Sequence, residues 1–60
     1  ADRIIGQEAV VIEAINPIDG TGQIKVLGQV WSAIADSNIE KDSKVQVTAI
    51  SGVKAVVSKM

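Results

Sequence analysis

Few residues of this 60-residue chain could carry covalent or acid–base chemistry. Histidine, cysteine and tyrosine are absent, so the usual general acid–base groups and nucleophiles are missing. A Ser–Lys pair is the only catalytic couple that the composition permits. Ser43 and Lys44 are adjacent, but neighbouring strand residues point to opposite faces and cannot easily cooperate. We therefore expect a domain that is not an enzyme and has no catalytic residues.

Metal and phosphate sites are also poorly supported. Glu40 and Asp42 flank Lys41 in a polar stretch, which is typical of a solvated turn and lacks the dense oxygen-ligand spacing of a calcium loop. Gly20 and Gly22 enclose a single threonine, with no lysine at Walker spacing and no helix after them. A loop that needs positive φ explains these glycines. We expect no metal and no cofactor.

Trp31 is the only aromatic residue and the one candidate for partner binding. It could fill a core otherwise made of valine and isoleucine. It could equally anchor a partner at the surface, because tryptophan is enriched among the residues that dominate interface energetics. On an extended strand Trp31 shares a face with Ala33 and Ala35, which suits either role. Both interpretations stay open at this stage.

Nucleic acid is not a favoured partner. Proteins that bind single strands combine a basic groove with several aromatic platforms, whereas this chain has one aromatic residue and a formal charge of -1. Binding of single-stranded nucleic acid therefore remains an alternative to the binding of a protein partner. Another alternative is a barrel that only stabilises or oligomerises a larger protein. The oligomeric state is left open.

The composition and the alternation of the chain predict β-strands. Nine valines and nine isoleucines stand against a single leucine, and branched Cβ atoms favour strands over helices. Alternation and turn residues predict five strands, over residues 8–15, 23–27, 29–35, 44–50 and 53–58. In the first, Val10 and Ile12 share one face, and Val11 and Glu13 the other. The segment 29–35 also shows a helical spacing between Val30 and Ile34, but it is too short to favour a helix.

These strands predict an all-β fold. Five short strands with tight turns leave no room for a crossover helix, and closure into a barrel buries the apolar face and removes the sheet edges. Ile39 is the one apolar residue in the polar stretch 36–43. The expected architecture is a five-stranded OB-type Greek-key β-barrel, formed by residues 1–60 as a single domain.

The order of several features along the chain points to a known family. A glycine-rich turn and a short Val/Ile strand come first, followed by Gly28, Trp31, Ala33, Ile39, the Val-x-Val strand of Val45 and Val47, and Gly52. In this order and spacing, nearly the whole chain resembles the C-terminal soluble domain of the NfeD family. It departs from the pattern at Asp42–Ser43, because the family often has a glycine before its Val-x-Val strand.

The resemblance implies an OB-fold domain carried at the end of membrane-spanning helices. It also implies a non-catalytic role in protein–protein interaction with stomatin- or flotillin-type membrane proteins. Longer family members carry a separate serine protease domain, none of whose catalytic residues maps onto this chain. The chain starts at Ala1 rather than methionine, and we expect it to be excised from a longer membrane-anchored protein. The membrane would be reached through segments outside this domain. We expect the domain itself to be soluble and on the cytoplasmic side.

Overall fold

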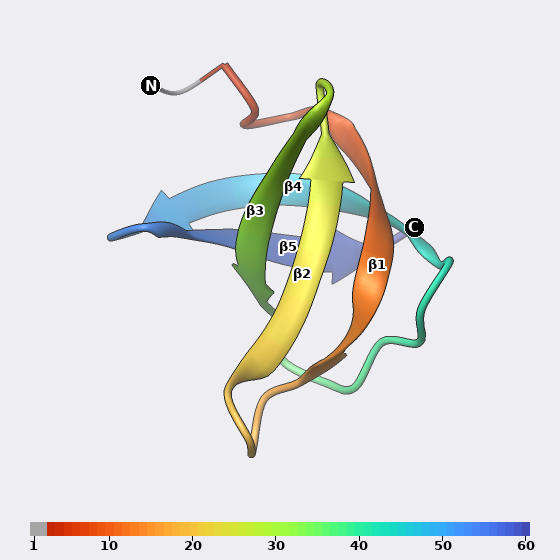
Figure 1. Ribbon diagram of the computed structural model, residues 1–60. Coiled ribbons are helices and arrows are strands. Elements are labelled where there is room, and N and C mark those ends of the chain that lie inside the picture. The colour runs from red at the N-terminus through yellow and green to blue at the C-terminus, as the bar shows by residue number, and fades with distance from the viewer. Residues whose placement is uncertain (1–2) are drawn as a thin grey trace.

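The chain folds into a closed five-stranded barrel in the computed structural model (Figure 1). The structure describes residues 3–60, so Ala1 and Asp2 lie outside the described residues. The strands are β1 (Glu8–Asn16), β2 (Thr21–Val26), β3 (Gln29–Ile34), β4 (Lys44–Ser51) and β5 (Lys54–Lys59). They follow the order β1-β2-β3-β5-β4, and β4 pairs again with β1. This arrangement confirms the predicted OB-type barrel.

The predicted strands are all present, with small shifts at their ends. The segment with the ambiguous pattern, 29–35, forms β3 over Gln29–Ile34. The second strand starts two residues earlier than predicted, at Thr21, and ends at Val26 because Leu27 belongs to the turn that follows. All strand pairs are antiparallel except β3 with β5, which is parallel.

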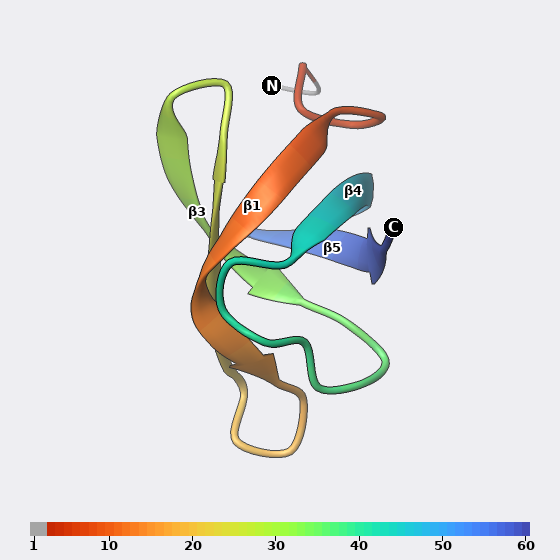
Figure 2. The same cartoon turned by 90° about the vertical axis from the view of Figure 1, so that its right-hand side faces the viewer.

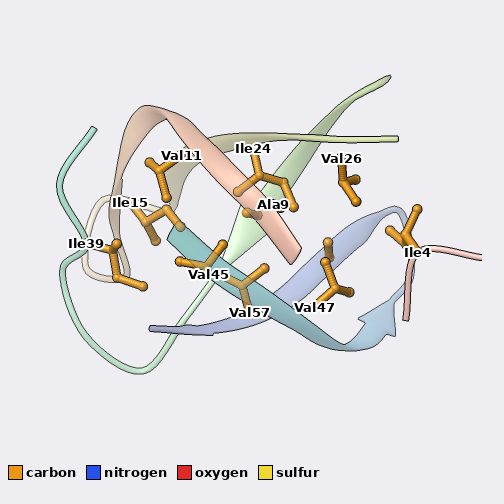
Figure 3. Close-up of a cluster of buried hydrophobic side chains, with 12 residues drawn as sticks. Ile4, Ala9, Val11, Ile15, Ile24, Val26, Ile39, Val45, Val47 and Val57 are labelled. Carbon is orange, nitrogen blue, oxygen red and sulfur yellow. The ribbon is translucent and has the colours of Figure 1, made fainter. Parts of the chain in front are cut away.

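Aliphatic side chains alone fill the barrel (Figure 3). Among the described residues the core holds twelve buried hydrophobic side chains and no buried polar one. Val11, Ile24, Val45 and Val47 are fully buried and come from three neighbouring strands. Small and branched side chains suit this core because a closed five-stranded barrel has little internal room.

Strict alternation fails in β1. We expected Glu13 on the face of Val11, but Val11 is buried and Glu13 is exposed. The cause is a pair of register shifts against β2, one between Val11 and Glu13 and one between Glu13 and Asn16. Each shift adds a residue to β1, bends it and changes which side chains point inward. Glu13 is therefore turned to solvent, and Ile15 returns to the core.

The connection between β3 and β4 closes one end of the barrel (Figure 2). Ile39, the apolar residue of this loop, is 2% exposed. Its backbone exchanges two hydrogen bonds with Ile15: the Ile15 N–H donates to the Ile39 carbonyl at 2.8 Å, and the Ile39 N–H donates to the Ile15 carbonyl at 3.0 Å. These bonds hold the Ile39 side chain in the core, where it plugs the barrel.

Asp42 and Ser43 form the turn at which the chain departs from the NfeD pattern, which often has a glycine before the Val-x-Val strand. The Asp42 φ of 72° lies in the left-handed region, which glycine adopts most readily and aspartate tolerates better than most residues. The Asp42 N–H donates to the Val11 carbonyl at 2.7 Å, and the Ser43 carbonyl accepts from the Val11 N–H at 2.9 Å. The turn thus keeps this geometry with aspartate and joins the start of β4 to β1.

Candidate functional site

Trp31 lies at the rim of the core. In the antiparallel pair of β2 and β3 it stands opposite the fully buried Ile24, which in turn stands opposite Val11 of β1. Trp31 is only half-buried, although it packs against the core cluster. Its indole thus packs against the core without being fully covered, and a partner-binding role for Trp31 stays a prediction.

The position of Trp31 follows from where β3 meets β5. These strands are in register only at Ala33 with Ala55 and at Ile34 with Val56. Trp31 precedes this seam, so no β5 residue stands beside it.

The hairpin of β2 and β3 also carries aliphatic side chains on its outside. Leu27 is 59% exposed and Val30 is 56% exposed. Val30 stands opposite Lys25, and Lys25 stands opposite the exposed Val10 of β1. Lys44 of β4 is the next partner of Val10, so a row of alternating valines and lysines crosses four strands. We call this row the Lys–Val row; its members are Lys44, Val10, Lys25 and Val30.

Leu27 has an unusual backbone for its residue type. Leu27 and Gly28 have φ values of 50° and 76°, which is the type I′ turn of two-residue hairpins. Asparagine or glycine normally occupies the first position, because a left-handed backbone costs other L-residues about 1–2 kcal/mol. An exposed leucine here is therefore a functional candidate. The sequence signalled the tight bend through Gly28 but gave no sign of the leucine's left-handed conformation.

The other residues examined for chemistry do not assemble into a site. Lys44 pairs with Glu8 of β1 at 3.7 Å, and both side chains are largely exposed. Within residues 3–60 no group of three or more acidic, histidine or cysteine residues could hold a metal ion, and the surface of this part of the chain shows no pocket. Gly20 and Gly22 both have positive φ, as predicted. Gly20 lies in the turn before β2, whereas Gly22 is part of β2 and not of the predicted loop.

No helix among the described residues is long and apolar enough to cross a membrane.

Comparison with known proteins decides the family. The family model of the NfeD-like C-terminal, partner-binding domain matches residues 1–59. The chain belongs to this family. An uncharacterised protein of Methanocaldococcus jannaschii is 32% identical to this NfeD-like domain over all 60 residues, which make up 43% of that relative. The chain therefore spans less than half the length of this curated relative.

Two solved structures share the fold of the NfeD-like domain. One is the C-terminal domain of the stomatin operon partner protein 1510-C from Pyrococcus horikoshii, 31% identical, with a TM-score of 0.84 over 98% of this chain and 91% of that one. The other is the soluble domain of a Corynebacterium glutamicum membrane protein implicated in the regulation of membrane protease activity. It is 28% identical, with a TM-score of 0.85 over 95% of this chain and 92% of that one.

Proposed function

We propose that this NfeD-like domain is a non-catalytic protein-interaction domain of a membrane-anchored protein, and that its partner is a stomatin- or flotillin-type membrane protein. The match to a partner-binding domain family over residues 1–59 carries this proposal. The relationship to a stomatin operon partner protein and to the soluble domain of a membrane protein supports the partner class and the membrane setting. We further propose that the domain is a single unit within a longer chain and faces the cytoplasm.

Trp31 is the proposed anchor of the partner. Interface hot spots are enriched in tryptophan and sit where a large side chain can be fully covered by the partner. The half-buried indole meets this requirement, because its core contacts already restrict its motion and its free side remains available. Leu27 and Val30 are exposed aliphatic side chains of the same hairpin, and Val30 lies on the face opposite to Trp31.

Substitution of Trp31 by alanine tests this role against a matched control. Ile50 of β4 is also half-buried and packs against the same core, but it lies outside the hairpin of β2 and β3. We expect both Trp31→Ala and Ile50→Ala to lower the free energy of unfolding, by about 1–3 kcal/mol, since each removes part of a side chain's core contacts. Only Trp31→Ala should weaken binding.

The measurement is a pull-down and a titration of the purified domain with the stomatin-type protein of the same organism, with circular dichroism as the check on folding. An affinity reduced at least tenfold in Trp31→Ala and unchanged in Ile50→Ala supports the proposal. Equal affinity for wild type and Trp31→Ala would make Trp31 a core residue only. No binding by the wild-type domain to stomatin- or flotillin-type proteins would refute the proposed partner class.

A further inference from the structure

The parallel seam between β3 and β5 is short, and this leaves part of β3 without a neighbour. Only Ala33 and Ile34 of β3 have partners on β5. The preceding stretch, Gln29–Ser32, pairs with β2 on one side. No strand of the described chain pairs with its other side. We call Gln29–Ser32 the free edge of β3.

The hairpin turn determines which backbone groups this edge offers. In a two-residue hairpin the residues flanking the turn, Val26 and Gln29, form a hydrogen-bonded pair. Hydrogen-bonded and non-hydrogen-bonded pairs alternate along antiparallel strands. Gln29 and Trp31 therefore direct their N–H groups toward β2, whereas Val30 and Ser32 direct theirs outward. The carbonyls of Val30 and Ser32 point to the same side as their N–H groups, and the Ser32 carbonyl borders the seam with β5.

The free edge lacks the features that usually prevent unwanted pairing. Exposed edges are commonly protected by lysine, proline or a bulge. Gln29–Ser32 contains no charged residue and no proline, and its register with β2 shows no shift. The β5 residues left without a β3 partner, Lys54 and Val57–Lys59, do include lysines. Trp31, on the core-facing side of the free edge, adds an apolar surface that an incoming chain would cover.

We propose that the free edge of β3 binds an extended segment of the partner protein as an additional strand. This inference rests on the proposed function and names its binding mode. Backbone hydrogen bonds to Val30 and Ser32 would hold the segment, and an aliphatic side chain on it would cover the free side of Trp31. On the opposite face the segment continues the Lys–Val row, in which Lys44 pairs with Glu8 and Lys25 makes no ion pair with another described residue. A carboxylate of the segment in this row complements Lys25.

Charge also argues for a foreign segment over a second copy of this chain. Two copies paired about Val30 would place two Lys25 side chains in one row with no acidic residue between them, whereas the Lys44 side chain at each end pairs with Glu8 of its own chain. Like charges in one row oppose such pairing, although salt screens much of the effect at a surface. A partner strand with acidic and aliphatic residues meets no such repulsion.

Val30→Pro tests the edge directly, with Val30→Ala as its control. Proline removes the outward N–H of Val30 and blocks an added strand, but that N–H makes no bond to β2, so the hairpin keeps its ladder. Alanine keeps the N–H and shortens the side chain. We expect Val30→Pro to reduce affinity for the stomatin-type protein at least tenfold and Val30→Ala to reduce it less than threefold, both with wild-type circular dichroism.

Equal binding by Val30→Pro and wild type, or equal losses in the two variants, would overturn the strand-addition mode while leaving the proposed function intact. Absence of binding by the wild-type domain would instead contradict the proposed function itself. If Val30→Pro does not fold, hydrogen exchange of the wild-type complex decides: we expect the amides of Val30 and Ser32 to gain protection, and unchanged exchange there refutes the mode. Sedimentation showing a dimer that Val30→Pro dissolves would assign the edge to a second copy and overturn the proposed occupant.

Discussion

Replacing Gly22 with alanine adds one methyl group at a place where the barrel has no room for it. Gly22 lies on β2 beside the bulged part of β1, and its φ is 140°. A Cβ atom there would stand 2.7 Å from Cγ1 and 2.8 Å from Cα of Ile15. A rotamer change can move the Cγ1 atom but not the Cα atom. The backbone of β1 would therefore have to move away, and the Ile15–Ile39 bonds that close the barrel would be disturbed.

The expected loss combines two effects. Overpacking of a well-packed core costs about 1–3 kcal/mol. Holding alanine at a φ that favours glycine costs a further 1–3 kcal/mol, roughly. We expect a total of about 4 kcal/mol, a large share of the roughly 3–9 kcal/mol that a domain of this size has in all. Since 1 kcal/mol shifts the Tm of a small domain by about 4–8 °C, the Tm should fall by about 16–32 °C.

Thermal and urea unfolding followed by circular dichroism measure this loss, and Gly20→Ala is the matched control. Gly20 also has a left-handed backbone, with a φ of 71°, but no atom lies within 4 Å of its would-be Cβ. Gly20→Ala should therefore lose only the conformational cost of about 1–2 kcal/mol. Equal losses in the two variants, or a Gly22→Ala variant within about 1 kcal/mol of wild type, would refute the steric argument.

Two further predictions concern the turn and the loop at opposite ends of the barrel. Leu27→Asn should raise the free energy of unfolding by about 1 kcal/mol, because asparagine accepts the left-handed backbone at lower cost; an unchanged or lower Tm would contradict the assigned strain. The same variant should bind the stomatin-type protein less tightly if the Leu27 side chain contacts the partner. Ile39→Ala should lower the free energy of unfolding by about 2–5 kcal/mol, because the removed side chain is buried in the core. Hydrogen exchange should then speed up at the Ile15 and Ile39 amides, and unchanged exchange there would show that the loop is held by other contacts.

The local pattern of the sequence determined most of the fold. Alternating β-branched residues and glycine-containing turns predict every strand to within two residues, because these signals depend on neighbours in the chain. The lack of histidine, cysteine and tyrosine restricts the chemistry in the same direct way. The order and spacing of Gly28, Trp31 and Ala33 with the later Val-x-Val strand gave the resemblance to the NfeD family, which the match over residues 1–59 confirms.

The tertiary structure decided what pairing between distant strands controls. The two register shifts of β1 against β2 turn Glu13 outward, against the alternation of its strand. Trp31 is half-buried because the parallel seam with β5 starts only at Ala33. The same short seam creates the free edge. No pattern within Gln29–Ser32 shows where β3 begins to pair with β5, because β5 lies more than twenty residues later in the chain.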